Sequence, residues 1–367
     1  MEKIIQAAVE RGASDLHIKS GDVFRARING QLVPLTKQRL SPEQTRQIAL
    51  QLIPNERDRQ RLDEMQDYDC SWGLPGVGRF RVNILRQRGS FMIVMRVIPI
   101  EIPTFDQLGL PAVLTDIAGN ERGLVLVTGV TGSGKSSTQA AMIGHMNQHM
   151  RRHVVTLENP IEFLHRDVNC SITQREIGVD TESFRIGLRA ALRQDPDVIL
   201  IGEMRDTESI DIALKSAETG HLVISTVHTK DAASTISRLV AVFPPDEQPV
   251  VRMRLAESLQ AVVSQRLLPR KDGKGRVLAA EVMVVTGTIR DCIADPARLS
   301  EIRELIAEGR TTYGMQTFDQ CLMDLVTEDR VDYGVAKAAA TNPGDFELKM
   351  NMLSGRSAGG SMSQSYF

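Results

Sequence analysis

Cysteine and aromatic residues are scarce in this chain of 367 residues. It has four cysteines, one tryptophan and 4% aromatic residues. The cysteines are far apart in the sequence, so there is no CxxC zinc knuckle and no disulfide framework. We expect isolated thiols in a reducing compartment. They are Cys70, Cys170, Cys292 and Cys321.

Long apolar runs are missing as well. No segment approaches the roughly 20 apolar residues of a membrane span. Residues 1–18 lack the basic and apolar regions of a secretion signal. We therefore expect a cytoplasmic protein that can still dock on a membrane complex.

An excess of charge of one sign is also absent. Lysine and arginine total 44, aspartate and glutamate total 46, and the formal net charge is −2. This balance argues against a protein that coats nucleic acid by charge alone, although it leaves room for a local basic channel. At about 150 residues per domain, the length predicts two domains.

The first hundred residues have the pattern of an α+β unit. A helix is predicted over 2–11, and alternating polar and apolar residues predict half-buried strands over 79–85 and 90–98. Residues 24–35 predict a hairpin that turns at Asn29-Gly30. Prolines then interrupt all periodicity, which predicts a first domain over 1–98 and a linker over 99–107.

From residue 108 onward, predicted strands alternate with predicted helices. The strands are continuous apolar runs, which favours an α/β fold with a largely parallel sheet covered on both faces. The expected strands are 123–128, 153–158, 197–202, 222–226 and 277–285. The expected helices are 135–150, 184–194, 209–218, 232–240 and 248–264. We predict an ATPase core over 108–290, a helical region over 291–353 and a disordered tail over 354–367.

One glycine-rich segment carries most of the chemistry. Residues 129–136, GVTGSGKS, match the P-loop (Walker A) pattern GxxxxGK[ST] at every fixed position, between an apolar strand and a helix. Such a loop directs backbone N–H groups at phosphate oxygens. Lys135 is expected to reach the β- and γ-phosphates and Ser136 to ligate Mg²⁺. The candidate nucleotide-binding residues are Gly129, Thr131, Gly132, Ser133, Gly134, Lys135, Ser136 and Ser137.

Carboxylates follow two other predicted strands. Glu203 comes after the apolar run 198–201, where it would act on Mg²⁺ through water or polarise the attacking water. Glu158 and Glu162 flank a proline after another strand, and a water attacking the γ-phosphoryl needs a positioned acceptor. Glu162 is the first choice for that base, while Glu158 would contact Mg²⁺ or orient Glu162. The candidate metal ligands are Ser136, Glu158 and Glu203.

His228 ends the predicted strand that begins after His221. A lone histidine in such a place is most often a core residue. Its position at the end of a strand parallel to the P-loop strand favours another role, in which it senses the γ-phosphate by hydrogen bonding.

Taken together, these residues resemble the secretion-type hexameric ATPases and, within them, the type IV pilus retraction motors. The resemblance covers residues 1–353, and its further markers are 13–18, 174–178, 192–208 and 218–229. It implies an N-terminal PAS-like domain joined to a RecA-like ATPase domain, a homo-hexamer, ATP/ADP and Mg²⁺ as cofactors, and a pilus platform protein of the inner membrane as partner. The implied function is ATP-driven pilus retraction, which underlies twitching motility.

Two features favour retraction over assembly. The resembling assembly ATPases carry a four-cysteine zinc site, which this chain lacks, so we expect no zinc. Residues 301–308, EIRELIAE, are similar to the retraction motif AIRNLIRE and depart from it at three positions. A solvated amphipathic helix is the other interpretation of that segment. The remaining alternatives are a pilus assembly or type II secretion ATPase, an accessory retraction paralogue, a non-catalytic adaptor and a nucleic-acid translocase. The low aromatic content argues against the translocase, so we expect no nucleic-acid partner.

Arginines are frequent on the two strands before the linker. Phosphoryl transfer builds negative charge that ring ATPases commonly offset with arginine from elsewhere. The resemblance points to Arg81 and Arg96 as charge-compensating residues, whereas a solvated strand face is the structural alternative. If two domains close on nucleotide, the segment 98–103 would act as the hinge that converts hydrolysis into domain rotation.

The loop assignment predicts the effect of Lys135→Ala. Tight ATP binding is expected to be abolished, because the cationic contact to phosphate is lost. The measurement is an equilibrium titration with a fluorescent ATP analogue. Unchanged affinity in the variant would remove the assignment.

Overall fold

Two compact units make up the chain. The computed structural model describes residues 1–28, 30–98, 101–204 and 206–358, with side chains as far as 353. Unit 1 comprises Met1–Ile102, Leu157–Arg166 and Gln174–Gly187. Unit 2 comprises Pro103–Thr156, Asp167–Thr173 and Leu188–Phe367. Two segments from the middle of the chain thus pack with the N-terminal residues, and the boundaries predicted at 98 and 108 stay a prediction.

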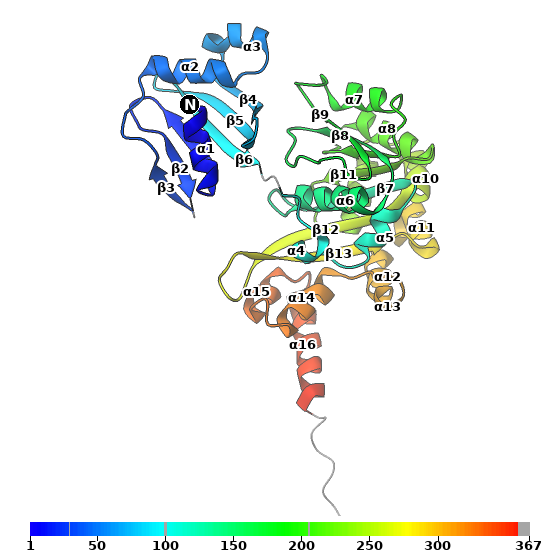
Figure 1. The fold of residues 1–367 in the computed structure, drawn as a ribbon. Coiled ribbons are helices and arrows are strands. Elements are labelled where there is room, and N and C mark those ends of the chain that lie inside the picture. Colours follow the sequence, from blue (N-terminus) through cyan, green and yellow to red (C-terminus); the bar gives the residue numbers. More distant parts are fainter. Residues whose placement is uncertain (29, 99–100, 205, 359–367) are drawn as a thin grey trace, which may run out of the picture. The chain divides into compact units, whose positions relative to one another are not determined.

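Unit 1 contains a six-stranded antiparallel sheet in the order β3-β2-β1-β6-β5-β4 (Figure 1). Its strands are β1 Ala13–Lys19, β2 Arg25–Ile28, β3 Gln31–Pro34, β4 Asp67–Leu74, β5 Gly78–Gln87 and β6 Ser90–Ile98. The hairpin predicted over 24–35 is confirmed as β2 and β3, while its turn residue Asn29 lies outside the described residues. Strand β4 was not predicted, because its aspartates and glycine are poor strand formers and only pairing with β5 specifies it.

Helices cover one face of this sheet. They are α1 Glu2–Glu10, α2 Pro42–Leu52, α3 Glu56–Gln60 and the 3₁₀ turn η1 Leu62–Glu64. Helix α2 starts in a capping box, in which the Ser41 side chain accepts from the Gln44 N–H and the Gln44 side chain accepts from the Ser41 N–H. Helix α1 contacts β1, and α2 contacts β1 and β6. Buried residues such as Phe80 and Ile93 alternate along β5 and β6 with other residues, of which Arg81 and Arg96 are exposed on the opposite face of the sheet.

The second sheet has seven strands in the order β13-β12-β7-β11-β10-β8-β9. They are β7 Gly123–Thr128, β8 His153–Glu158, β9 Ser171–Glu176, β10 Val198–Ile201, β11 Leu222–Val227, β12 Leu259–Pro269 and β13 Arg276–Val284. Strands β12, β7, β11 and β10 pair in parallel, and β13 is antiparallel to β12. Every residue of β7, β10 and β11 is buried, which explains their unbroken apolar runs. The fold is therefore α/β, with a largely parallel sheet as predicted.

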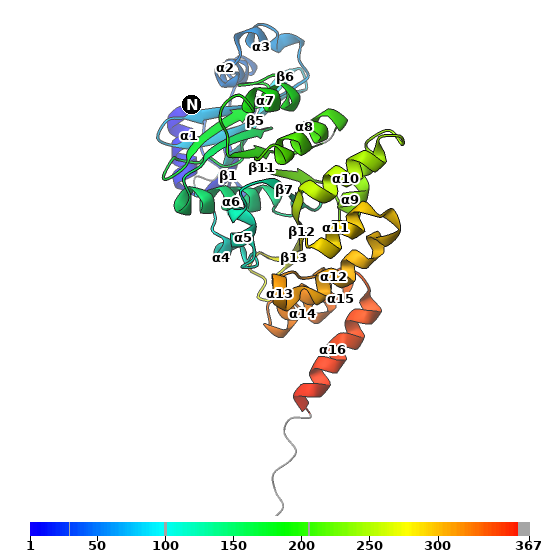
Figure 2. The same ribbon diagram turned by 90° about the vertical axis from the view of Figure 1, so that its right-hand side faces the viewer.

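Helices pack on both faces of this sheet. They are α4 Phe105–Leu108, α5 Leu114–Gly119, α6 Lys135–His149, α7 Phe184–Ala191, α8 Thr207–Glu218, α9 Ala232–Ala241 and α10 Gln248–Ser258. Figure 2 shows the strands between α6 on one side and α8, α9 and α10 on the other. Helix α4 begins inside the predicted linker, where Thr104 forms its capping box with Gln107, and ends one residue beyond it.

One predicted helix was wrong in its second half. Residues 248–264 were expected to be helical throughout, but α10 ends at Ser258 and β12 begins at Leu259. Strand β12 pairs with β7 on one side and with β13 on the other. The apolar run fits a buried helix and a buried strand equally well, and the long-range pairing decides between them.

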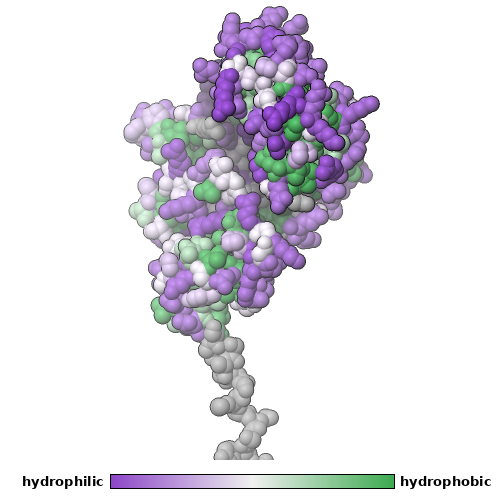
Figure 3. All heavy atoms as spheres, turned by 90° about the vertical axis from the view of Figure 1, so that its left-hand side faces the viewer, coloured by the Kyte–Doolittle hydropathy of each residue, from purple (hydrophilic) through white to green (hydrophobic). Residues whose placement is uncertain are grey.

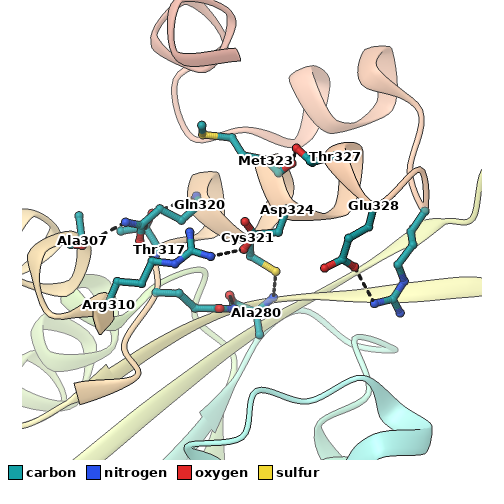
Figure 4. Close-up of polar contacts among 12 residues, drawn as sticks. Ala280, Ala307, Arg310, Thr317, Gln320, Cys321, Met323, Asp324, Thr327 and Glu328 are labelled. Carbon is teal, nitrogen blue, oxygen red and sulfur yellow. Dashed lines mark hydrogen bonds and ion pairs between the residues drawn. The ribbon is translucent and has the colours of Figure 1, made fainter. Parts of the chain in front are cut away.

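The C-terminal region is helical, as expected. Its elements are α11 Gly287–Ala294, η2 Pro296–Glu301, α12 Ile302–Glu308, α13 Arg310–Tyr313, α14 Phe318–Thr327, α15 Tyr333–Ala339 and α16 Pro343–Ala358. Figure 4 shows α14 lying on β13, where the Ala280 N–H donates to the Cys321 Sγ at 3.5 Å and Arg310 pairs with Asp324. Helix α16 continues to Ala358, so residues 354–358 of the predicted tail are helical. Residues 359–367 lie outside the described part of the chain.

Figure 3 shows one face, on which polar side chains predominate and apolar ones form small separate areas. Within the part of the chain that the structure describes, no helix combines the length and the apolarity needed to cross a membrane.

A buried carboxyl on β13 makes the stability of the fold depend on pH. Glu281 is buried and accepts a hydrogen bond from the Ala232 N–H at 2.9 Å. Burial raises the pKa of this carboxyl from 4.5 to about 7, with a smaller contribution from Asp231. Because the pKa of Glu281 is higher in the folded state, its contribution to the free energy of unfolding is complete below pH 4.5. This contribution is lost as the pH rises through 7.

We therefore predict that Glu281→Gln flattens the pH profile of stability. Relative to the variant, the wild type should lose up to about 3 kcal/mol between pH 5 and 8, at about 1.4 kcal/mol per pKa unit. Urea unfolding across this range measures the difference, with the exposed Glu247→Gln as control. Parallel profiles for wild type and Glu281→Gln would contradict the prediction.

Candidate nucleotide-binding site

The phosphate loop lies in unit 2, between β7 and α6. Gly129 has a φ of +141°, and a Cβ added there would lie 2.5 Å from the Gln265 carbonyl oxygen and 2.5 Å from the Ser133 Oγ. Only glycine fits this approach. Gly132 and Gly134 also have positive φ, +78° and +93°, but Gly132 faces open space. The loop thus has the backbone conformation that the motif predicts.

Buried polar atoms line the inside of the loop. The Lys135 ammonium is largely buried and donates to the carbonyl oxygens of Gly129 at 2.9 Å and of Val130 at 3.1 Å. Ser133 is also buried, and its Oγ has no hydrogen-bond partner among the described residues. A buried hydroxyl without a partner costs free energy unless something else bonds to it. The loop is therefore suited to an anionic phosphate group.

The remaining loop residues lie at the surface. Thr131 is exposed, whereas Ser136 and Ser137 are partly exposed on the first turn of α6. The N-terminus of a helix favours negative charge. Ser136 is thus placed where a nucleotide-bound cation could be reached.

Strand β12 supports the loop from the side. The Thr128 hydroxyl donates to the Ser264 Oγ at 2.9 Å, and the Gln265 side-chain amide donates to the Thr138 Oγ1 on α6 at 2.6 Å. The buried Gln265 Oε1 has no partner among the described residues. The sequence pattern did not single out Gln265, because the helix predicted over 248–264 hid the strand to which this residue belongs. The polar pair Ser264-Gln265 inside an apolar run was the available signal.

Glu203 and His228 meet at one edge of the sheet. Strands β10 and β11 pair as far as Ile201 and Ser225, and one residue further the Thr226 hydroxyl donates to the Gly202 carbonyl oxygen at 2.6 Å. This brings the His228 Nε2 to 3.7 Å from the Glu203 Oε2. The side chain of Glu203 is 19% exposed and that of His228 is 47% exposed. His228 is therefore no core histidine.

The acidic segment around Glu158 belongs to unit 1. Glu158 ends β8, and its Oε1 accepts from the Gln174 side-chain amide at 3.0 Å. The same amide donates to the Phe163 carbonyl oxygen at 2.9 Å, and the Gln174 Oε1 accepts from the His165 N–H at 2.9 Å. Glu162 lies on this loop with its side chain exposed. Gln174 thus holds the loop that carries the candidate base.

Arg81 and Arg96 are also in unit 1. They lie directly opposite each other on β5 and β6, and Asp15 is opposite Arg96 on β1. The Arg96 Nε donates to the Asp15 Oδ1 at 3.0 Å, yet its side chain is 70% exposed. Arg81 is exposed as well. These contacts are compatible with both interpretations of the two arginines, a solvated strand face and residues that compensate for phosphate charge.

The predicted site residues divide between the two units. The phosphate loop, Glu203 and His228 are in unit 2, whereas Glu158, Glu162, Arg81 and Arg96 are in unit 1. Among the described residues, no group of three or more histidine, cysteine, aspartate or glutamate side chains could hold a metal ion on its own. A hydroxyl and isolated carboxylates match a magnesium ion that arrives with phosphates, because Mg²⁺ is usually held by few protein ligands.

The loop, its helix and the carboxylate after β10, a parallel strand separated from β7 by β11, define a P-loop nucleotide-binding protein. A family model described as "Type II/IV secretion system protein" matches residues 1–329, and the chain belongs to this family.

Relatives match along most of the chain. The type IV pilus ATPase PilU of Pseudomonas aeruginosa is 41% identical over 355 residues, which cover 96% of this chain and 91% of PilU. The type IV pilus retraction ATPase PilT of the same organism is 42% identical over 344 residues, covering 94% and 99%. The crystal structure of the pilus retraction motor PilT with bound ADP has a TM-score of 0.86 and 43% identity, covering 95% and 99%.

Gly129 and Gly132 form a matched pair for testing the loop. In Gly129→Ala, the new methyl group would meet the Gln265 carbonyl oxygen, and we expect a loss of about 3 kcal/mol in unfolding free energy. In Gly132→Ala the methyl group meets nothing within 4 Å, so only the positive φ costs about 1 kcal/mol. Urea unfolding without nucleotide measures both variants. Equal losses would contradict the close approach of β12.

Proposed function

We propose that this protein is an ATP-hydrolysing motor that powers type IV pilus retraction, and with it twitching motility. The observation that carries the proposal is an intact phosphate loop in a chain that is similar to PilU and PilT along nearly its whole length. The PilT structure with bound ADP supports an adenine nucleotide as the ligand of the loop.

The residues of the loop fit ATP. Backbone N–H groups of 129–134 and the Ser133 hydroxyl bind phosphate oxygens, and Lys135 neutralises the β- and γ-phosphates. Thr131 and Ser137 contribute hydroxyl groups at the rim of the loop. Mg²⁺ supplies neutralisation of phosphate charge, and Ser136, Glu158 and Glu203 are its proposed ligands, directly or through water.

Catalysis needs an acceptor for a water proton and compensation for negative charge. Glu162 accepts the proton of the attacking water, and Glu158 orients the Glu162 side chain. Glu203 polarises the water, and the exposed imidazole of its neighbour His228 senses the γ-phosphate. Arg81 and Arg96 supply positive charge to a nucleotide site between domains or subunits.

At the level of architecture, unit 1 includes a PAS-like domain and unit 2 a RecA-like ATPase domain. Six copies form a ring that works at the inner face of the cytoplasmic membrane, against the pilus platform protein. Loss of the γ-phosphate releases the closed domains, and the linker converts this release into domain rotation. Similarity to the type IV pilus retraction ATPase PilT over 94% of this chain supports the proposed role in retraction.

A second candidate function is pilus assembly or type II secretion. It uses the same phosphate loop and carboxylates, so the site does not separate the two. The absence of a CxxC pair and the segment 301–308 favour retraction.

Removing the gene from the parent organism tests the direction of force. Cells are complemented with wild type, Glu203→Gln or the control Glu247→Gln, whose carboxylate is exposed outside the site. We expect abundant surface pili without twitching in the deletion, with rescue by wild type and by the control only. Electron microscopy and a surface motility assay provide the measurements.

Other outcomes separate the alternatives. Cells without pili would identify an assembly ATPase. Full rescue by Glu203→Gln would contradict the catalytic role of that carboxylate.

A further inference from the structure

Glu176 is a buried carboxylate outside the predicted nucleotide-binding and catalytic residues. It is the last residue of β9, belongs to unit 1, and its side chain is 3% exposed. Its Oε2 accepts from the Ser71 hydroxyl at 2.8 Å, from the Arg79 guanidinium at 2.6 Å and from the Ile161 N–H at 3.1 Å. A buried carboxylate is tolerated when a cation and hydrogen bonds compensate for its charge, and here three donors meet on one oxygen.

These donors come from two different segments. Ser71 on β4 and Arg79 on β5 belong to the N-terminal antiparallel sheet, whereas Ile161 lies on the loop between Glu158 and Glu162. Glu176 therefore connects the acidic loop to the sheet inside unit 1.

The connected face of the sheet is the one that carries the arginines. Ser71 is directly opposite Arg81, and Arg81 is directly opposite Arg96. Directly opposite residues share a face, and Arg79, two positions before Arg81, shares it as well. Removing Glu176 would free the acidic loop from this arginine-bearing face.

Two further contacts fix Glu176 and the rest of the loop. The Glu176 N–H donates to the Asp180 Oδ2 at 2.8 Å, which restrains the end of β9. Gln174, two residues earlier on the same strand, holds Glu158 and the Phe163 carbonyl oxygen. β9 thus supports the acidic loop at its start, middle and end.

We propose that Glu176 is a positioning residue, which fixes the loop bearing Glu158 and Glu162 against the arginine face through its ion pair with Arg79. This inference rests on the proposed ATPase function. A base must lie within hydrogen-bond reach of its proton, and a displacement of about 1 Å can cost about a hundredfold in rate.

The test uses the full-length protein, four single variants and the double variant of Glu176→Gln with Arg79→Met. Glu176→Gln keeps the shape and an acceptor oxygen but removes the charge. Arg79→Met removes the cation, and Arg79→Lys retains it. Asp69→Asn is the matched control, because Asp69 bonds Asn83 at 3.2 Å across the same two strands at an exposed position.

Two readouts are measured on each variant. The first is steady-state ATP turnover, resolved into kcat and KM. The second is hydrogen–deuterium exchange of the peptide covering residues 157–166. Arg79 acts on this loop through Glu176, so faster exchange there in Arg79→Met reports the transmitted effect and requires no activity.

We expect Glu176→Gln and Arg79→Met each to lower kcat about tenfold or more, with KM within about twofold of wild type. Their combination should cost no more than the larger single effect, since both break one ion pair. Arg79→Lys and Asp69→Asn should stay within about threefold of wild type.

Wild-type kcat in Glu176→Gln and Arg79→Met, or additive losses in the double variant, would overturn the proposal. A rise in KM at constant kcat would overturn it too, because it indicates substrate binding. If Glu176→Gln does not fold, the two Arg79 variants decide alone. Wild-type protein without ATP turnover would contradict the proposed function, whereas unchanged exchange in Arg79→Met would contradict this inference.

Discussion

The phosphate loop depends on how closely β12 approaches the end of β7. Ser264 pairs with Thr128, so the next residue, Gln265, brings its carbonyl oxygen to the place where a side chain at position 129 would be. The same residue reaches α6 with its side chain and bonds Thr138. One parallel strand pairing therefore fixes both the start of the loop and the first turns of the helix that follows it.

Two buried glutamates show how the surroundings decide what such a carboxyl can do. Glu281 accepts from one backbone N–H, and burial raises its pKa to about 7. Glu176 accepts from a guanidinium, a hydroxyl and a backbone N–H. The first makes stability sensitive to pH, whereas the second joins segments that are about a hundred residues apart in sequence.

Much of the fold and site could be predicted from local patterns. The P-loop, the apolar strands and the strand-end position of Glu203 are encoded within a few residues each, and so is the hairpin of β2 and β3. Strands β4 and β9 were missed because polar residues are frequent in them, and β12 was missed because its apolar run fits a buried helix as well. Gln265 and Glu176 were missed because the side chains that bond them lie about a hundred residues or more away in the sequence. The ion-pair distance between Glu203 and His228 is a finding of the structure that the sequence did not predict, while the catalytic roles of both residues stay predictions.

The packing of residues 157–166 and 174–187 with the N-terminal residues has a consequence for how such chains can recombine. A crossover near residue 102 would exchange the N-terminal sheet but leave both segments behind, next to a sheet with which they did not evolve. The buried carboxylate of Glu176 would then meet foreign neighbours instead of Ser71 and Arg79. Recombination therefore cannot readily exchange the N-terminal sheet alone. A compatible exchange must include residues 157–166 and 174–187 as well.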